Sequence, residues 1–270
     1  LPKQPRNDIY NHNNDTFREL VLLWGKLNLV TIIENDISPH IFLNNIGDIL
    51  LYDRPTLDWL NNVDYKLGLF GNSDLPNNNK VNHHWIFWPR NPIELNNYCH
   101  NNPSDAYDNR NINTIFIGKI ENNVQAQYRD LDKWRKYIDF FDIVNSATNK
   151  YSSAEYLQLL SKSKYGLCLR GYGPKCNREI EYLALGVVLL VTDDVSLSYY
   201  NSLTENVHYI KIKDPSDIIN INNITEKQWT YMSQKCIEWY NNNSSVLGSF
   251  NTTLDVIQQY IPIKQMLKKN

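Results

Sequence analysis

The sequence predicts an α/β protein whose C-terminal half forms a doubly wound parallel sheet. Short apolar runs alternate there with segments of helical periodicity, which is the pattern of strand–helix–strand units. The run Val187–Thr192 is apolar at all but its last position, as in a strand buried on both faces. A glycine-containing loop, Gly171–Gly173, stands between a strand-like run and a helix-like run. Such sheets bind ligands at the carboxyl ends of their strands, so the site is expected at this loop.

The elements of the C-terminal half follow from local patterns. Ser152 precedes Glu155 by three residues, a capping box that opens a helix. Gly186 follows an apolar segment at a position where a left-handed residue closes a helix. The predicted strands are Thr114–Gly118, Tyr165–Leu169, Val187–Thr192 and Val207–Ile212. The predicted helices are Gln125–Phe141, Ser152–Ser161, Cys176–Leu185 and two segments that begin near Thr225 and Ser245.

The first half is less regular and of the same kind. Strands are expected at Leu29–Glu34, Asp48–Tyr52, Leu67–Gly71 and His84–Trp88, and helices at Thr56–Asn62 and Pro92–Tyr98. The polar stretch Asn101–Asn113 contains Pro103 and is the predicted linker. We therefore expect an N-terminal lobe over residues 1–110, a lobe with the ligand site over residues 111–222, and C-terminal helices over residues 223–270.

Composition and charge exclude several classes of protein. Of the 270 residues, 42% are apolar and 12% aromatic, so the chain is expected to be globular. The formal net charge is −2 and the cationic residues are scattered, which argues against nucleic-acid binding. The four cysteines form no CxxC pair, so reduced thiols are expected and a zinc site is not.

No membrane span is predicted, because no apolar run approaches the roughly 18 residues that a span needs. The sequence begins at Leu1 without an initiator Met or a signal pattern, which leaves open whether a segment precedes it. The absence of a signal or membrane segment favours a cytoplasmic location. A lumenal location stays open if an upstream anchor is missing, and the oligomeric state is not predicted.

The segment Arg170–Gly186 has the features of an anion site. A helix that opens after a glycine loop directs unpaired backbone N–H groups and a positive dipole at a ligand. Arg170, Lys175 and Arg178 add three cations within nine residues of a nearly neutral protein. A diphosphate fits this arrangement, with loop residues at its edge: Gly171, Tyr172 and Gly173. Each feature alone also has an ordinary explanation, as a turn or a set of solvated charges.

Two glutamates of the same predicted helix compete for a second role. Glu179 and Glu181 are two residues apart and therefore lie on different faces of the helix, so only one is expected to face the ligand. A carboxylate at this place could accept hydrogen bonds from both hydroxyls of a ribose. Either glutamate could instead simply favour the start of the helix.

The segment Arg178–Leu190 resembles the exostosin-type (family 47) glycosyltransferase pattern. In that pattern an Arg is followed after three residues by Glu, then after five by Gly and an apolar strand, and Arg178, Glu181 and Gly186 fall in register. The resemblance implies a GT-B fold, with two Rossmann-like lobes facing a cleft and C-terminal helices that pack back on the N-terminal lobe. It also assigns Glu181, rather than Glu179, to the nucleotide-sugar site.

The resemblance extends upstream over most of the second half. Lys164–Leu169 is similar to the strand before the motif, and Ile115–Lys119 with Arg129 is similar to the opening strand and loop of the same lobe. Gly118, Lys119 and Arg129 thereby join the expected nucleotide-sugar site. The loop Leu169–Lys175 departs from the family, in which a Pro-Ser-rich loop is more usual. The N-terminal half shows no motif match.

The expected function is the transfer of a sugar from a nucleotide-diphosphate sugar to a glycan or other hydroxyl acceptor. The resemblance implies an inverting reaction, with UDP as the first guess for the donor nucleotide and GDP as the second. No cofactor and no essential metal are predicted, because Asp130-Leu131-Asp132 falls inside a predicted helix and Asp193-Asp194 are adjacent. A general base is expected from the N-terminal lobe, in the order Asp74, Asp53, His83, although each Asp also suits a turn.

Two other interpretations stay open. A non-catalytic nucleotide- or glycan-binding module would keep the anion site and lack the base. A Rossmann-type oxidoreductase would use Gly171-Tyr172-Gly173 as the first half of GxGxxG, with Asp193 about 20 residues on, but Cys176 stands where the third Gly belongs.

Overall fold

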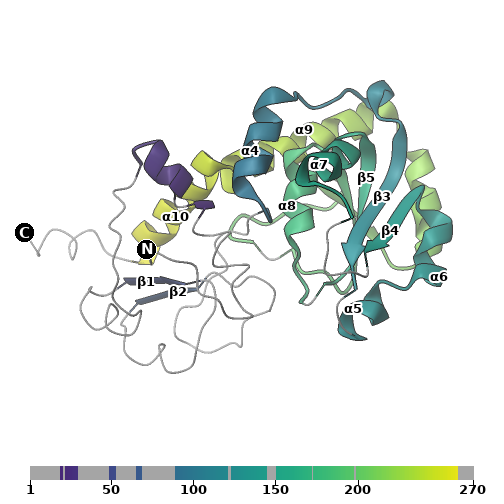
Figure 1. Ribbon diagram of the computed structural model, residues 1–270, viewed down its shortest axis with the longest axis horizontal. Helices are drawn as coiled ribbons and strands as arrows, with labels where there is room; N and C mark the ends of the chain where they lie inside the picture. Colours follow the sequence, from purple (N-terminus) through teal and green to yellow (C-terminus); the bar gives the residue numbers. More distant parts are fainter. Residues whose placement is uncertain are drawn as a thin grey trace, which may run out of the picture.

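The computed structural model describes residues 19–20, 22–29, 49–52, 65–68, 89–120, 123–144, 150–171, 173–197 and 199–260. A five-stranded parallel sheet forms the centre of its larger part (Figure 1). The strands are β3 (Ile112–Lys119), β4 (Phe140–Val144), β5 (Ser163–Cys168), β6 (Val188–Thr192) and β7 (Tyr209–Ile212). The helices are α4 (Pro92–Asn101), α5 (Asn123–Tyr128), α6 (Leu131–Trp134), α7 (Ser153–Ser161), α8 (Asn177–Ala184), α9 (Glu226–Asn243) and α10 (Val246–Tyr260). Three 3₁₀ segments complete the list: η1 (Tyr107–Asn109), η2 (Arg135–Tyr137) and η3 (Pro215–Asn223).

The strand order places a switch point between β3 and β5. Across the sheet the order is β4-β3-β5-β6-β7, and all neighbours are parallel. The chain moves from β3 outward to β4 and then crosses back to β5 on the other side of β3. In such sheets a ligand crevice opens beyond the carboxyl ends of the two strands where the direction reverses. These ends are Lys119 and Cys168.

Apolar side chains are buried on both faces of the sheet. The neighbours Ile115 and Phe116 of β3 belong to opposite cores, and α9 contributes Trp229 to one core and Trp239 to the other. Figure 1 shows α4, α7 and α8 together on one side of the sheet. Two covered faces explain why β6 is apolar without alternation. The predicted α/β class and the parallel sheet of the C-terminal half are confirmed.

The single helix predicted over Gln125–Phe141 is wrong. The segment instead forms α5, α6 and η2, followed by β4. Asp130 restarts the helix as the N-cap of α6, where its carboxylate accepts hydrogen bonds from the backbone N–H groups of Asp132 and Lys133. The aromatic and β-branched residues of β4 pair with β3. The spacing of these residues also fits a helix, but pairing with β3 stabilises the extended strand.

Three predicted helix ends are confirmed. The Ser152 side chain accepts from the N–H of Glu155, whose carboxylate accepts from the N–H of Ser152, and α7 begins there. Thr225 caps α9. Gly186 has φ +67°, a left-handed conformation that glycine adopts without strain, and it follows the C-cap of α8.

The N-terminal half contributes β1 (Ile49–Tyr52) and β2 (Tyr65–Gly68), which pair in parallel as a separate two-stranded sheet. These strands match the predictions at Asp48–Tyr52 and Leu67–Gly71, with β2 beginning earlier. The predicted helix at Pro92–Tyr98 is confirmed as α4. The remaining elements predicted for this half lie, apart from Leu29, outside the described residues: Leu29–Glu34, Thr56–Asn62 and His84–Trp88.

Segments on both sides of the expected boundary contact the five-stranded part. Helix α4 packs against α7 and α8. Within the stretch predicted as a linker, Arg110 is buried and donates to the carbonyl oxygens of Ser163 and Leu185. At the other end of the chain, Trp24 Nε1 donates to the carbonyl oxygen of Val246 in α10, at 2.8 Å. The division into lobes and the GT-B arrangement stay predictions.

The described ranges contain neither a candidate membrane span nor a disulfide. No helix within those ranges is both long and apolar enough to cross a membrane. The four cysteines all fall within them and are unpaired thiols, as the sequence predicts.

Candidate functional site

The amino end of α8 lies over the switch point of the sheet. The helix begins at Asn177, after the loop that follows β5. Arg178, in its first turn, reaches across to β3, where Nε donates to the carbonyl oxygen of Ile117 at 3.0 Å. Because Ile117 lies two residues before the end of β3, this bond holds the helix start beside the crevice between β3 and β5. The backbone N–H groups and the dipole at this end favour an anion.

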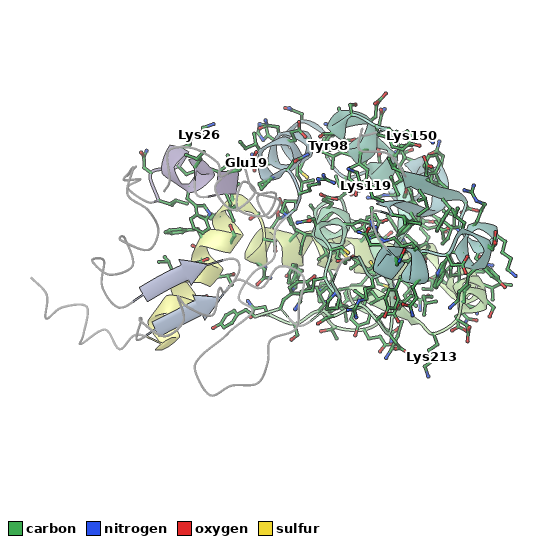
Figure 2. All side chains as sticks on the ribbon, turned by 60° about the horizontal axis from the view of Figure 1, so that its bottom comes forward. Glu19, Lys26, Tyr98, Lys119, Lys150 and Lys213 are labelled. Carbon is green, nitrogen blue, oxygen red and sulfur yellow. The ribbon has the colours of Figure 1, made fainter. Side chains whose placement is uncertain are left out.

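Arg129 joins the two loops that border the crevice. Its guanidinium is buried, and Nε donates to the carbonyl oxygen of Arg170 at 3.1 Å. Nη1 donates to the carbonyl oxygen of Lys119, and Nη2 lies 3.8 Å from the Cys176 sulfur. One buried cation therefore fixes the end of β3 against the loop after β5. Figure 2 labels Lys119, which lies nearer the centre of this part of the molecule than Lys150 and Lys213.

Two buried guanidinium groups share one aromatic ring at this place. Arg178 Cζ lies 4.3 Å and Arg129 Cζ 5.9 Å from the centroid of the Phe116 ring. Burial, and next to it the positive charge of Arg178, lower the pKa of Arg129 to about 10. Like charges held together away from water repel, and the neighbouring Glu179 offsets part of this repulsion.

Four buried side-chain atoms near the start of α8 have no hydrogen-bond partner. They are Arg170 Nε, Arg178 Nη1, Glu179 Oε1 and Tyr199 OH, and no other such side-chain atom occurs in the part of the chain that the structure describes. Buried polar atoms are almost always paired, since an unpaired one costs about 1–3 kcal/mol. Their concentration here indicates a binding site whose ligand supplies the missing partners.

The loop between β5 and α8 is held close to Arg129. Gly171 N donates to the carbonyl oxygen of Gly173 at 3.1 Å. A Cβ at Gly171 would lie 2.6 Å from the Cys176 sulfur and 2.9 Å from Arg129 Nη2. A larger residue would require Cys176 or Arg129 to shift, so Gly171 suits close packing around the cations, and its predicted role at a phosphate stays a prediction.

Glu179 faces a second, internal side of the helix start. It is 0% exposed, and its Oε2 accepts the backbone N–H of Cys176 while Oε1 has no partner. Burial raises the pKa of Glu179 from 4.5 to about 7, against the opposing charge of Arg178. The Tyr199 ring lies on this side as well, 5.9 Å from Nζ of buried Lys175.

Glu181 is engaged differently from Glu179. Its Oε1 accepts the backbone N–H of Arg90 at 3.0 Å, and its Oε2 accepts the hydroxyl of Tyr156 at 2.7 Å. The carboxylate therefore connects α8 to α7 and to the segment that enters from the N-terminal half. A role for Glu181 toward ribose stays a prediction, and it would have to use the remaining lone pairs of these oxygens.

Comparisons with known proteins leave the family open. No protein-family model matches the chain, and no curated protein sequence matches it either. Among solved structures, the chain is similar to a glycosyltransferase from Rickettsia africae ESF-5, with a TM-score of 0.48 and 12% identity. That similarity covers 96% of this chain and 96% of the other. At this TM-score it does not decide the function, and the exostosin-type pattern stays a resemblance.

The structure gathers most of the predicted site residues at one place. Around the crevice and the start of α8 lie Gly118, Lys119, Arg129, Arg170, Gly171, Gly173, Lys175, Arg178 and Glu181. Tyr172 lies outside the described residues, as do the three candidates for the general base, Asp53, Asp74 and His83. The roles of all these residues toward a ligand stay predictions.

Three residues beside the site escaped the sequence analysis: Tyr156, Arg90 and Tyr199. Each comes from an element other than the motif, and no local pattern distinguishes it. Tyr199 follows β6, the strand next to β5, so the parallel topology would have placed its loop at the same edge of the sheet. The resemblance favoured Glu181 over Glu179, whereas the unpartnered Oε1 makes Glu179 a candidate for ligand contact as well.

The structure gives the position of Asp193 and the arrangement of possible metal ligands. An oxidoreductase would need Asp193 at the ligand. The Asp193 side chain is 59% exposed and pairs with Lys211 at 2.7 Å. Lys211 belongs to β7, which lies further from the switch point than β6. Among the described residues no group of three or more His, Cys, Asp or Glu could hold a metal ion. Metal independence of the reaction stays a prediction.

Proposed function

We propose that this chain is a glycosyltransferase that moves a sugar from a nucleotide-diphosphate sugar to a hydroxyl of a glycan or other acceptor. The observation that carries the proposal is the set of buried, unpartnered atoms at the start of α8. Arg170 Nε and Arg178 Nη1 are donors that suit phosphate oxygens, whereas Glu179 Oε1 is an acceptor that suits a hydroxyl. Nucleotides and nucleotide sugars carry both groups.

The step from binding to transfer rests on the sequence motif. Arg178, Glu181 and Gly186 match the exostosin-type pattern. The order β5, loop, α8, β6 is the strand–loop–helix–strand context that this pattern requires, and it supports the match. The same resemblance favours UDP as the donor nucleotide, with GDP second. A module that only binds the nucleotide is the alternative, and the transfer assay below separates the two.

The arrangement suits the chemistry of a departing diphosphate. When the bond between the sugar's anomeric carbon and the diphosphate oxygen breaks, negative charge develops on the diphosphate. Arg129, Arg170 and Arg178 lie beside the helix start, so the positive charges are in place before the bond breaks. In the inverting reaction implied by the resemblance, a base takes the proton of the attacking hydroxyl, and Asp74, Asp53 and His83 are its candidates.

Binding is tested by thermal unfolding with UDP, GDP, CMP and dTDP. We expect one nucleoside diphosphate to raise the melting temperature of the wild type and of the control R135Q, whose arginine is exposed. R178Q should bind it roughly 30-fold more weakly, because about 2 kcal/mol is typical of a charge-assisted hydrogen bond. Stabilisation by none of the four, or equal binding by R178Q and the wild type, would contradict the proposal.

Transfer is tested with a labelled donor of the nucleotide identified in this way. The products are separated after incubation with a panel of sugar acceptors, and donor hydrolysis is measured in parallel. D74N, D53N and H83A should include one variant that retains nucleotide binding and loses turnover. Near wild-type turnover in all three would refute the assignment of the base, and binding without transfer or hydrolysis would favour the binding module.

A further inference from the structure

A cavity of about 500 Å³ lies at the amino ends of the strands, at the opposite end of α8 from the proposed nucleotide site. Helices α4, α7 and α8 all end at this cavity, and α9 contributes a further wall. Helix α8 begins with Asn177 near the crevice and ends with Ala184 in the cavity wall, so about 12 Å of helix separates the two places. A cavity of this size accommodates a small molecule, and such a ligand is distinct from one at the start of α8.

The charges in the cavity wall favour a neutral ligand. Lys162 Nζ lies 2.8 Å from Asp105 Oδ2, and no other charged residue lines the cavity among the described residues. Converging helix ends would favour a cation. The carbonyl oxygens at these ends are already occupied, because that of Leu185 accepts from Arg110 Nη2 and that of Gln158 accepts the N–H of Lys162. An added ion of either sign would therefore compete with groups that already balance each other.

Three amide side chains converge on the cavity with their hydrogen-bonding groups unused. Asn101, Gln158 and Asn241 come from α4, α7 and α9 respectively, and all three are exposed. None of the three amides makes a side-chain hydrogen bond to a described residue. An amide group both donates and accepts hydrogen bonds, as a hydroxyl does. A ligand with several hydroxyl groups can therefore use both halves of each amide.

Tyr240 of α9 adds a hydroxyl to the same wall. The residue is only 6% exposed and lines the cavity, yet its hydroxyl makes no hydrogen bond to a described residue. This hydroxyl is not one of the four sealed atoms near the start of α8, so it stays accessible. A tyrosine hydroxyl usually finds a partner when the ring is buried. A hydroxyl of a ligand in the cavity would supply that partner.

Apolar groups form the rest of the wall. The Tyr98 ring is held in place by a hydrogen bond of 2.8 Å between its hydroxyl and Ser161 Oγ, and Figure 2 labels this tyrosine. Leu185 and Ile237 also line the cavity. A sugar ring has apolar C–H faces and hydroxyl groups at its edge. It therefore matches a wall that combines aromatic and aliphatic groups with amides.

We propose that this cavity is a second binding site, which takes a neutral carbohydrate. The inference goes beyond the proposed function, because sugar binding here requires neither a nucleotide nor a transfer reaction. In an enzyme that extends a glycan, a second carbohydrate site holds the acceptor chain on the protein and raises its effective concentration at the reacting end.

Binding is tested by saturation-transfer NMR on the wild type. The neutral probes are glucose, galactose, mannose and N-acetylglucosamine, with the disaccharides maltose, cellobiose and lactose. The charged probes are glucosamine and glucuronate. We expect a neutral sugar to bind more tightly than both charged probes. Tighter binding of a disaccharide than of its monosaccharides identifies a glycan chain as the ligand, and equal binding identifies a free sugar. Binding of none of the neutral probes, or tighter binding of either charged probe, overturns the inference.

The place of binding is tested with matched variants of α9. Y240F removes the hydroxyl and keeps the ring, and N241A removes one exposed amide. Their controls are Y231F and N242A, since Tyr231 and Asn242 are exposed on the same helix and do not line the cavity. We expect Y240F and N241A each to bind the sugar about fivefold more weakly, and the controls to bind it as the wild type does. Unchanged affinity in both Y240F and N241A, or an equal loss in the controls, overturns the inference.

R178Q separates this site from the nucleotide site. The variant changes the far end of α8, so it should bind the sugar as the wild type does while its nucleotide binding falls. Loss of sugar binding in R178Q would place the sugar at the start of α8 and overturn the second site. A wild type that binds a neutral sugar but none of the nucleotides would instead refute the proposed function and leave the second site standing.

Discussion

Two buried arginines at opposite ends of the sheet differ in how completely they are paired. At the amino ends of the strands, Arg110 Nη1 donates to the carbonyl oxygen of Ser163 at 2.6 Å and Nη2 to that of Leu185 at 2.7 Å. Its Nε donates to the carbonyl oxygen of Asp105 at 3.1 Å. At the carboxyl ends, Arg178 makes one bond through Nε, and its buried Nη1 has none.

We propose that the difference separates a side chain that holds the fold, Arg110, from one that binds a ligand, Arg178. Both are nearly fully buried, at 2% and 7% exposed, so burial does not distinguish them. The cavity of about 500 Å³ lies at the amino ends, lined in part by Cys99, Ser104 and Lys162. No unpartnered buried side-chain atom lines it among the described residues, whereas the carboxyl ends gather four such atoms. We therefore place the proposed nucleotide site at the unpartnered atoms rather than at the cavity.

The largest effect is expected from removing the fully paired arginine. R110A removes three hydrogen bonds to backbone carbonyl oxygens, of which that of Leu185 keeps another donor, the Ser104 hydroxyl. At about 1 kcal/mol for each bond, the free energy of unfolding should fall by about 3 kcal/mol. R178Q breaks a single bond and should lose only about 1 kcal/mol. Urea unfolding measures both. An equal loss in the two variants would remove the distinction between the two ends of the sheet.

Burial of Glu179 at the carboxyl ends of the strands makes the stability of the folded chain depend on pH. An unfolded carboxyl group releases its proton near 4.5, whereas Glu179 in the folded chain holds it to about 7 because of burial. The folded state therefore binds more protons across this window, and stability falls as the pH rises through it. The full penalty, about 3 kcal/mol, is present above pH 7.

E179Q removes this titration and keeps an acceptor for the Cys176 N–H. We expect E179Q and the wild type to be similarly stable near pH 5, and E179Q to be more stable near pH 8. Urea titrations at both pH values measure the difference between the two proteins, in which the other titrating groups cancel. A wild type that is no less stable than E179Q at pH 8 would show that Glu179 is satisfied in the folded chain.

The two ends of α8 should respond differently to added methyl groups. Gly186 has φ +67°, and a Cβ there would lie 2.7 Å from Ser233 Oγ, so G186A should destabilise the chain by about 1–2 kcal/mol and leave nucleotide affinity unchanged. G171A would push against Cys176 and Arg129, and it should weaken nucleotide binding. Thermal unfolding with and without nucleotide reports both effects. Equal affinity of G171A and the wild type would argue against a site at this loop.

The smallest effect is expected from Asp193. Its carboxylate is exposed and pairs with an exposed lysine, and such pairs contribute little. D193N should leave the affinity for nucleotides and the melting temperature unchanged within error. A marked loss of affinity for a nicotinamide dinucleotide in D193N would revive the oxidoreductase interpretation.

Local signals in the sequence predicted the parts of the fold that depend on local chemistry. The capping box at Ser152, the cap at Thr225 and the left-handed Gly186 each set a helix end from adjacent residues. Strand β4 was missed, because its apolar residues continue a helical spacing and only pairing with β3 selects the extended form.

Some residues of the candidate site could likewise be predicted from local sequence, and others could not. The cations of Arg170–Arg178 cluster in the sequence and could be predicted from it, and the fold brings Arg129 beside them. Tyr199 and Tyr156 lie on other elements, so only the folded arrangement brings them to α8. The distinction between Glu179 and Glu181 required knowledge of their hydrogen-bond partners, which no spacing contains.

The most direct test of the account measures both stability and affinity in two matched variants, R178Q and R110Q. The account predicts that R178Q keeps nearly the full free energy of unfolding and binds the identified nucleoside diphosphate roughly 30-fold more weakly. R110Q should lose stability and, where it remains folded, bind that nucleotide as the wild type does. Undiminished nucleotide binding by folded R178Q would contradict the central claim that Arg178, through its unpaired Nη1 at the start of α8, binds the phosphates.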